Sequence, residues 1–391
     1  MKIAILTSGI RPVPAVQGGA VENLVDFYLE YNNQNKTHDI TVYSVWHPEV
    51  KHHKALQSNV NHYKYIKTGT LLNKLRKYIF HRQHTNTYYN YTVEFYLKWA
   101  FSQISKQHYD IILIENRPGF ALKLKETGMP IVCHLHNDFL NCNIAQNKEI
   151  FEATSLFLNV SDYIKERVLT IDSSITKCKT LHNAIDTQRF YQAESVKRES
   201  FGISKEDFVI VYHGRLIKEK GILQLIQAIK ETSSIKNLKL LIIGSKSYGK
   251  GQMPSAFMKQ LEKEAISINN IVVFTGFIDY NQVPSYLKMA DIAVVPSMWE
   301  EPFGLTVVET MAAGLPLITT RSGGIPEICE GVATIVERDN IVENLAVAIL
   351  DLYQHPEKRQ KMAAASLERS KLFDKETYAK NFFKAIEEVR L

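Results

Sequence analysis

The chain has 391 residues, of which 45% are hydrophobic and 23% charged, and its formal net charge is +6. Such a chain is too long for one ordinary core, so we expect two globular domains. No apolar run reaches the about 18–20 residues of a membrane span, which excludes an integral membrane protein. The four cysteines are scattered without a Cys-x-x-Cys pair, which suits a reducing cytoplasm and argues against a zinc site or a disulfide framework.

The first half of the chain alternates short apolar runs with longer amphipathic ones. The N-terminal apolar run is too short for a signal peptide and is interpreted as a first buried strand. A helix is expected to begin near Gly19 and to run through AVENLVDFYLEY. Strands are expected at 2–8, 38–45, 109–116, 130–135 and 156–161.

The second half shows the same alternation more clearly. Ile222, Leu225, Ile226 and Ile229 recur with helical spacing. Continuous apolar strands that alternate with helices indicate parallel sheets covered on both faces, hence two doubly wound α/β domains. The polar stretch 186–206 is the expected link between them, and 374–391 the expected last helix. Strands are expected at 207–214, 238–244, 271–277, 291–297, 315–320 and 332–337.

The loop HGRLIKEKG, residues 213–221, follows an apolar strand and precedes a helix. Ligands of open parallel sheets bind beyond the carboxyl ends of the strands, where this loop lies. Gly214 permits a tight exit, and Arg215 and Lys220 lie near a helix N-terminus that favours anions. Two cations there suit a diphosphate. The alternative is an ordinary solvated loop.

The stretch EEPFGLTVVE, residues 300–309, follows another apolar strand. Its glutamates Glu301 and Glu309 are separated by seven residues. A glutamate in an early helical turn favours the helix dipole, which accounts for Glu309 but not for Glu301 in an apolar loop. Carboxylates that bind sugar or ribose hydroxyls are the alternative. The amides at the expected helix start offer a phosphate cradle, at Phe303, Gly304, Leu305 and Thr306.

Two further stretches end strands of the first half. In QGGAVENLV, Gly18 and Gly19 allow a close approach of backbone to a ligand, although a plain turn fits as well and the dinucleotide pattern G-x-G-x-x-G is absent. In CHLHND, His136 with Asp138 is either catalytic or a polar strand end. His134 and His136 also suggest a metal, but no third ligand is near them in the sequence.

Taken together, GRLIKEKG, EPFGLTVVE and GGAVE, in two Rossmann-like halves, resemble the family 4 glycosyltransferases of the retaining GT-B type. HNAIDTQRF, FTGF and SGGIPEI match as well, and 46–108 matches weakly. The resemblance implies two doubly wound domains that face each other across a cleft. The acceptor-binding domain would comprise 1–190 plus 374–391, with the last helix crossing back to it, and the donor-binding domain 200–370.

The resemblance also implies the residues of the site. Arg215 and Lys220 would hold the donor diphosphate, Glu301 the sugar hydroxyls and Glu309 the ribose. His136 would lie near the transferred sugar. The remaining donor contacts would come largely from backbone, at Gly18, Gly19, Gly214, Phe277, Ile278, Phe303, Gly304, Leu305 and Thr306.

The activity implied is transfer of a hexose-type sugar, with retention, from a nucleotide-diphosphate sugar to a glycan or lipid-linked acceptor. The process would be the synthesis of envelope polysaccharide, lipopolysaccharide or another glycoconjugate. No Asp-x-Asp pair is present to hold a metal, so we expect no required metal or other cofactor and assign charge neutralisation to Arg215, Lys220 and helix-start amides. Rival interpretations are a sugar-nucleotide epimerase or phosphorylase on the same architecture and a non-catalytic partner subunit.

Residues 51–100 carry most of the basic character, with nine Lys/Arg residues against one acid, Glu94. Seven tyrosines and five histidines accompany them. Nucleic-acid recognition motifs are absent, so we expect no nucleic-acid partner. The open alternatives are a solvated helix face and a contact with an anionic membrane surface, which would place a cytoplasmic enzyme peripherally on the inner face of the cell membrane.

Overall fold

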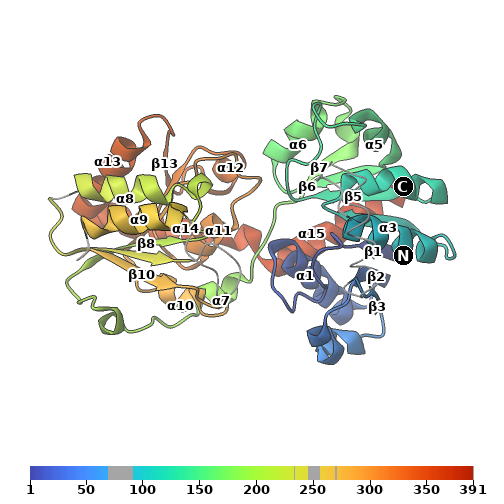
Figure 1. Ribbon diagram of the computed structural model, residues 1–391, viewed down its shortest axis with the longest axis horizontal. Coiled ribbons are helices and arrows are strands. Elements are labelled where there is room, and N and C mark those ends of the chain that lie inside the picture. Colours follow the sequence, from blue (N-terminus) through green and yellow to red (C-terminus); the bar gives the residue numbers. More distant parts are fainter. Residues whose placement is uncertain (69–90, 233, 245–255, 269–270, 391) are drawn as a thin grey trace. The chain divides into compact units, whose positions relative to one another are not determined.

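The computed structural model describes residues 1–68, 91–232, 234–244, 256–268 and 271–390. The chain forms two compact units (Figure 1). Unit 1 comprises Met1–Asn183 with Lys375–Leu391, and unit 2 comprises Ala184–Asp374.

Unit 1 is built on a seven-stranded parallel sheet in the order β3-β2-β1-β4-β5-β6-β7. The five expected strands are present. Two edge strands were not expected, because β3 (NHYKYI) has no continuous apolar run and β7 has three residues. The strands are β1 (Lys2–Leu6), β2 (Asp39–Val45), β3 (Asn61–Ile66), β4 (Ile111–Glu115), β5 (Ile131–Leu135), β6 (Leu156–Asn159) and β7 (Cys178–Thr180).

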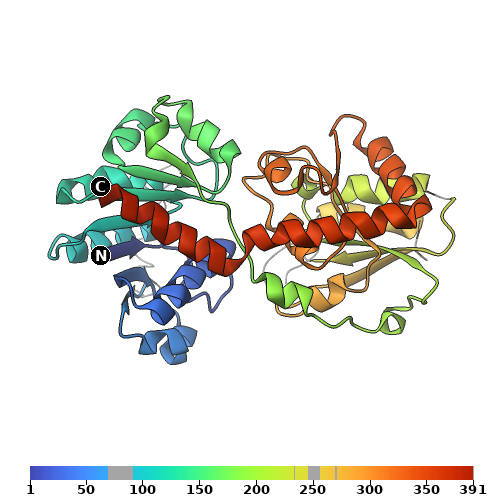
Figure 2. The same ribbon diagram turned by 180° about the vertical axis from the view of Figure 1, so that it is seen from behind.

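The helices of unit 1 include the last one of the chain. Helix α15 packs against α1, where the rings of Phe382 and Tyr28 stack with centroids 4.0 Å apart and planes 3° apart. Figure 2 shows α15 in red, running to the C-terminus beside the sheet of unit 1. The helices are α1 (Ala20–Asn35), α3 (Tyr91–Ile104), α4 (Ala121–Leu124), α5 (Asn147–Ala153), α6 (Asp162–Leu169) and α15 (Lys375–Glu387).

Unit 2 has a six-stranded parallel sheet in the order β10-β9-β8-β11-β12-β13. All six expected strands are present. They are β8 (Phe208–His213), β9 (Leu238–Ile243), β10 (Val272–Gly276), β11 (Ile292–Val295), β12 (Leu317–Thr320) and β13 (Thr334–Val336). The helices are α7 (Thr187–Tyr191), α8 (Ile222–Glu231), α9 (Ala256–Ile266), α10 (Val283–Leu287), α11 (Leu305–Ala312), α12 (Ile325–Cys329), α13 (Ile341–Gln354) and α14 (Pro356–Ser370).

The polar stretch 186–206, expected as a link, instead packs onto unit 2. Phe190 is buried against the ring of Tyr280, at a centroid distance of 6.1 Å. Arg198 donates to the carbonyl of Met289 at 2.8 Å and pairs with Asp291 at 3.1 Å. A few buried side chains therefore anchor a stretch whose overall composition is polar.

Only part of the basic segment 51–100 can be compared with its predictions. Residues 69–90 lie outside the described residues, whereas the flanking parts form two 3₁₀ turns, β3 and α3. Among the helices that the structure describes, none is long and apolar enough to cross a membrane. The membrane-surface contact stays a prediction.

Candidate functional site

In unit 2, the loops after β8 and β11 lie at the carboxyl edge of the sheet. The two strands are hydrogen-bonded neighbours, and both run parallel. The loop after β8 contains Lys220 and leads into α8, and the loop after β11 contains Glu301 and leads into α11. Strand pairing therefore brings together two motifs that are about 80 residues apart in the sequence.

Lys220 and Glu301 form an ion pair at this edge. Nζ of Lys220 lies 2.5 Å from Oε1 of Glu301, and their side chains are 16% and 7% exposed. The hydroxyl of buried Ser297 donates to the same oxygen at 2.6 Å. A carboxylate removed from water needs such charged and neutral donors, which answers why a glutamate occurs in an apolar loop.

Glu309 lies in the second turn of α11 and accepts two hydrogen bonds. Nε2 of His213, the last residue of β8, lies 2.8 Å from Oε2. The hydroxyl of Tyr280 donates to Oε1 at 2.8 Å. Burial and the neighbouring Glu309 raise the pKa of Tyr280 well above its ordinary value, so it remains a donor. Glu309 is thus a buried acceptor near the start of α11. The helix dipole alone does not explain its burial or its two hydrogen bonds.

Close backbone contacts hold these loops together. Gly221 has φ +68°, and a Cβ there would lie 1.8 Å from the carbonyl oxygen of Pro296. Gly323 has φ +51°, and a Cβ there would lie 2.2 Å from the carbonyl oxygen of Glu301. The amide of Gly324 donates to that same carbonyl at 2.8 Å. Both positions therefore need glycine for their conformation and for space.

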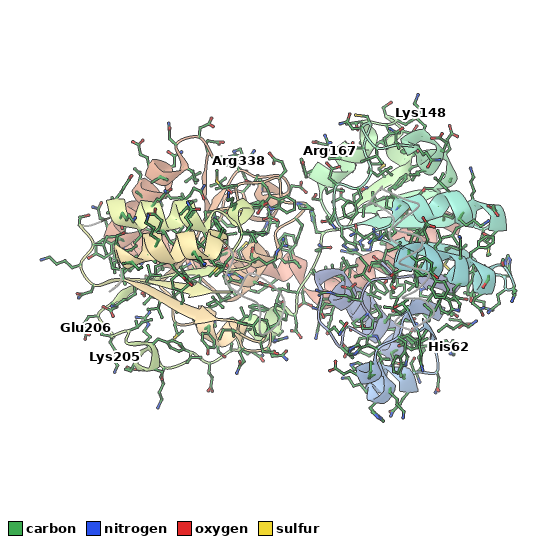
Figure 3. All side chains as sticks on the ribbon, in the orientation of Figure 1. His62, Lys148, Arg167, Lys205, Glu206 and Arg338 are labelled. Carbon is green, nitrogen blue, oxygen red and sulfur yellow. The ribbon has the colours of Figure 1, made fainter. Side chains whose placement is uncertain are left out.

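Glu300, directly before Glu301, is exposed but also structural. Its carboxylate accepts from the amide of Gly323 at 2.6 Å and pairs with Arg338, which is labelled in Figure 3. The loop after β12 is thereby tied to the loop after β11.

Unit 1 holds a different cluster, at the carboxyl ends of β4 and β5. Glu115 ends β4, and the strand register pairs it with His134. Nε2 of His136 lies 2.8 Å from Oε2 of Glu115, and Nδ1 of His134 lies 3.2 Å from the same oxygen. The hydroxyl of Tyr28, on α1, donates to Oε1 at 2.8 Å. All four residues are buried.

The electrostatics of this cluster follow from its burial. Burial alone would raise the pKa of Glu115, but attraction to His134 and His136 and their hydrogen bonds hold it well below its usual range. Burial and the neighbouring His134 lower the pKa of His136, against the opposing effect of Glu115. The favoured state at neutral pH is a carboxylate beside a neutral His136.

The three residues Glu115, His134 and His136 offer ligand atoms that fit a metal by chemistry alone. The expectation that no third ligand accompanies the two histidines is therefore wrong, because Glu115 supplies one from the neighbouring strand. However, the carboxylate already accepts hydrogen bonds from Tyr28 and from an imidazole on each oxygen, which accounts for the arrangement as a hydrogen-bonded cluster. We assign no metal to it.

The start of α1 carries a carboxylate of its own. Gly19 is the N-cap, with φ +128°, and its missing Cβ would lie 2.1 Å from Oε2 of Glu22. Ser8 donates to Oε1 of Glu22 at 3.3 Å. Burial raises the pKa of Glu22, while its own backbone amide and Arg11 oppose that rise. A phosphate at Gly18 and Gly19 would have this carboxylate as a neighbour.

Part of the chain matches a known protein family. Residues 194–369 match the family model "Glycosyl transferases group 1". Over these residues the chain is similar to the glycosyl transferases group 1 family. The match spans nearly all of unit 2, including the Lys220–Glu301 pair and Glu309.

Individual relatives match the chain over more of its length. Spore coat protein SA of Bacillus subtilis is 26% identical over 385 residues, which cover 94% of this chain and 93% of the relative. A lipopolysaccharide 1,2-N-acetylglucosaminetransferase of Salmonella typhimurium is 26% identical over 65% of this chain and 67% of its own. Among solved structures, Anabaena Alr3699/HepE in complex with UDP superposes with a TM-score of 0.74 at 19% identity, over 99% of this chain and 100% of that one. The two Rossmann-like units have the GT-B architecture.

The other predicted positions of unit 2 lie after its strands and at the start of α11. Gly304 is the N-cap of α11, Leu305 and Thr306 open its first turn, and Phe303 is buried against the ring of Phe373 at 5.7 Å. Gly214 follows β8, and Arg215 is exposed. Phe277, 44% exposed, and Ile278 follow β10.

Asp138 does not join His136, although the sequence allowed that pairing. Its carboxylate pairs with Nε of Arg167, labelled in Figure 3, at 2.8 Å and accepts from Asn141. Sequence reasoning also missed Glu115, Tyr28, Ser297, His213 and Tyr280 as partners of the predicted residues. The available indication for Glu115 was a lone carboxylate at the end of the otherwise apolar run IILIE.

Proposed function

We propose that this chain transfers a hexose-type sugar, with retention of configuration, from a nucleotide-diphosphate sugar to a glycan or lipid-linked acceptor. The process is the synthesis of a glycan, lipopolysaccharide or glycolipid. The observation that carries the proposal is the Lys220–Glu301 ion pair at the carboxyl edge of the sheet of unit 2, with Glu309, bonded to His213, as a second buried acceptor. The match of residues 194–369 to the group 1 family model and the UDP bound by the Anabaena protein support it.

In this proposal Lys220 serves two anions. It neutralises Glu301 within the protein and stabilises the charge that develops on the leaving diphosphate. Arg215, exposed on the same loop, and the first amides of α11 provide further positive potential. These groups replace a metal, so we propose that none is required.

The proposed chemistry is attack on the face that the diphosphate leaves. The bond between the anomeric carbon and the phosphate oxygen breaks, and the acceptor oxygen forms its bond on the same face. The acceptor's proton passes to the departing phosphate. Glu301 binds sugar hydroxyls and Glu309 binds the ribose, so neither carboxylate is the nucleophile of a double displacement.

The acceptor proposed here rests on the names of two relatives. The names of the Salmonella relative and of a Corynebacterium glutamicum phosphatidylinositol monomannoside mannosyltransferase, 27% identical over 53% of this chain, point to lipid-linked glycans. A peripheral contact of the basic segment with an anionic membrane surface would bring the enzyme to such acceptors. Binding to vesicles with and without anionic lipid tests that contact.

The donor is tested by thermal unfolding of the purified chain with UDP-glucose, UDP-N-acetylglucosamine, GDP-mannose, dTDP-glucose and ADP-glucose. A donor at a hundred times its Kd should stabilise the chain by about 2.7 kcal/mol. Slow hydrolysis of that donor should persist in EDTA, whereas loss of all hydrolysis in EDTA would overturn metal independence. Stabilisation without any hydrolysis or transfer would favour a non-catalytic subunit, and formation of an isomerised nucleotide sugar an epimerase.

A further inference from the structure

The carboxylate of Glu309 in unit 2 has one protein donor on each of its oxygens. Nε2 of His213 lies 2.8 Å from Oε2, and the hydroxyl of Tyr280 lies 2.8 Å from Oε1. A carboxylate offers about four lone-pair positions, shared equally by its two oxygens. The side chains that the structure describes therefore use one position on each oxygen, and the second position on each is left for a ligand.

The two donors reach Glu309 from different elements of unit 2. His213 ends β8, and Tyr280 lies in the loop after β10, which is separated from β8 by β9 in the sheet. Glu309 itself lies on α11. Because each oxygen has its own donor, a rotation of the carboxylate would break both hydrogen bonds. The plane of the carboxylate is thus set before a ligand binds.

The ring of Tyr280 is in turn held by α7, although the residue is 41% exposed. The guanidinium carbon of Arg189 lies 5.0 Å from the centroid of the ring, and the ring of Phe190 meets it at 6.1 Å with an angle of 61° between the planes. Asp186 caps α7 by accepting from the backbone amide of Arg189 at 3.2 Å. A cation over its face and an aromatic neighbour fix the orientation of a ring that solvent would otherwise leave mobile.

We propose that His213 and Tyr280 are positioning residues that clamp the carboxylate of Glu309, so that its two remaining lone pairs accept both hydroxyls of a ribose and the site selects ribonucleoside over 2′-deoxyribonucleoside diphosphates. The identity of the ligand rests on the proposed function. The clamp itself rests on the two hydrogen bonds and on the contacts of the Tyr280 ring.

The class of ligand follows from the chemistry of the clamped group. A carboxylate without a proton donates nothing to a phosphate oxygen, so the diphosphate is not its partner. Two hydroxyls on neighbouring carbon atoms, on the same side of a ring, can each donate to one oxygen of a fixed carboxylate. Ribose has such a pair at its 2′ and 3′ positions. A 2′-deoxyribose has only one of the two hydroxyls and leaves one oxygen without its donor, which costs binding energy.

The selectivity is tested by titration calorimetry of the full chain with UDP, GDP and ADP and with the 2′-deoxy form of each. For the nucleotide that binds best, loss of the 2′ hydroxyl should weaken binding about tenfold to a hundredfold, as expected for a hydrogen bond to a charged group. Equal affinity for the two forms, or dTDP-glucose as the best ligand of the thermal-unfolding panel, would overturn the selectivity. Absence of binding by every nucleotide would instead overturn the proposed function, and the assignment of a ribose with it.

Tyr280→Phe tests the clamp, because it removes the donor to Oε1 and keeps the ring that contacts Arg189 and Phe190. The ratio of ribonucleotide to 2′-deoxyribonucleotide affinity should shrink about threefold to tenfold, the equivalent of one lost hydrogen bond. The matched control is Tyr286→Phe, at a half-buried tyrosine of α10 whose ring packs against Phe201 at 5.6 Å. A merely structural tyrosine would change the stability of unit 2 but not this ratio. The same ratio in wild type and Tyr280→Phe would therefore overturn the role of Tyr280.

His213 is tested by a pair of variants that differ in their ability to donate. The amide of His213→Gln can still donate to Oε2 of Glu309, whereas His213→Leu has no donor. The ratio of the two affinities should stay closer to that of the wild type in His213→Gln than in His213→Leu. A wild-type ratio in His213→Leu, or an equal loss in both variants, would overturn the role of the His213 hydrogen bond.

Discussion

The two units hold buried carboxylates at the carboxyl ends of their strands, but by different means. In unit 1, side chains hold Glu115, namely Tyr28, His134 and His136. In unit 2, the loop that carries Glu301 is fixed largely by backbone, through the close approaches at Gly221 and Gly323. The side chains of Lys220 and Ser297 then donate the hydrogen bonds that the Glu301 carboxylate accepts.

This difference determines what a substitution can do. A site held by side-chain hydrogen bonds can be altered one bond at a time without a change of fold, because each bond contributes about 0.5–1.5 kcal/mol. A site held by close backbone contacts cannot be weakened in such small steps. A single methyl group added at Gly221 or Gly323 already clashes with a carbonyl oxygen. In unit 2, substitutions that change activity without a large loss of folding stability should thus be confined to the charged side chains.

The largest effect is expected for Lys220→Ala. It removes a preorganised cation, so kcat should fall about 10²–10³-fold, with a smaller loss of stability from the unpaired Glu301. Steady-state kinetics with the selected donor measure it. The matched control is Lys218→Ala, an exposed lysine of the same loop; comparable rates in the two variants would refute the assignment of Lys220.

Gly221→Ala tests the backbone half of the comparison. The added Cβ would meet the Pro296 carbonyl at 1.8 Å in a left-handed conformation, so unit 2 should lose about 3 kcal/mol of unfolding free energy. Gly202→Ala is the control, because Gly202 has a similar φ of +66° and nothing within 4 Å of the added atom. Urea unfolding should show a loss of only about 1 kcal/mol there. Equal losses would mean that the contact with Pro296 contributes little.

Glu309→Gln should act on binding more than on turnover. The amide keeps the size of the side chain but loses its charge and one acceptor, so KM for the donor should rise about tenfold while kcat changes little. Donor titration by calorimetry and steady-state kinetics measure this split. Glu343→Gln, on the exposed face of α13, is the control. A fall in kcat at constant KM would assign Glu309 to the chemical step instead.

The last test concerns the pH dependence of stability, and it contrasts Asp26 with Glu115 inside unit 1. Burial raises its pKa to about 7, although it accepts from the amide of Ala15 at 2.8 Å. A carboxyl whose pKa is raised on folding stabilises fully below its ordinary value near 4, and that stability is lost as pH rises through about 7. The melting temperature of the wild type relative to Asp26→Asn should therefore fall between about pH 4 and about pH 7 and stay level above that. Parallel curves for the two proteins would contradict this.

The sequence predicted the fold of unit 2 more completely than that of unit 1 for a physical reason. Strands buried on both faces, such as FVIVYH of β8, are apolar throughout and easy to recognise. The edge strand β3 is half-exposed and carries His62 and Lys64, so no apolar run marks it. The stretch 186–206 was expected to be a link because its composition is polar. A few buried residues, above all Phe190, nevertheless anchor it to unit 2.

For the candidate site, the sequence identified residues but not their partners. The spacing of Glu301 and Glu309 indicated two buried acceptors, yet their donors come from other strands and loops. The contact of Glu115 with His134 depends on the register of β4 and β5, which no local pattern encodes. Position along the chain shows which side chain ends a strand, and only the sheet order shows which side chains meet there.

The discontinuity of unit 1 has a consequence for how the protein is made. Tyr28 and His134 contact α15, but α15 is the last helix of the chain and follows the whole of unit 2. During translation the face of α1 that carries Tyr28 stays uncovered until residues 375–387 have left the ribosome. Unit 2 can complete its core earlier, so the domain that begins synthesis first is the last to finish folding.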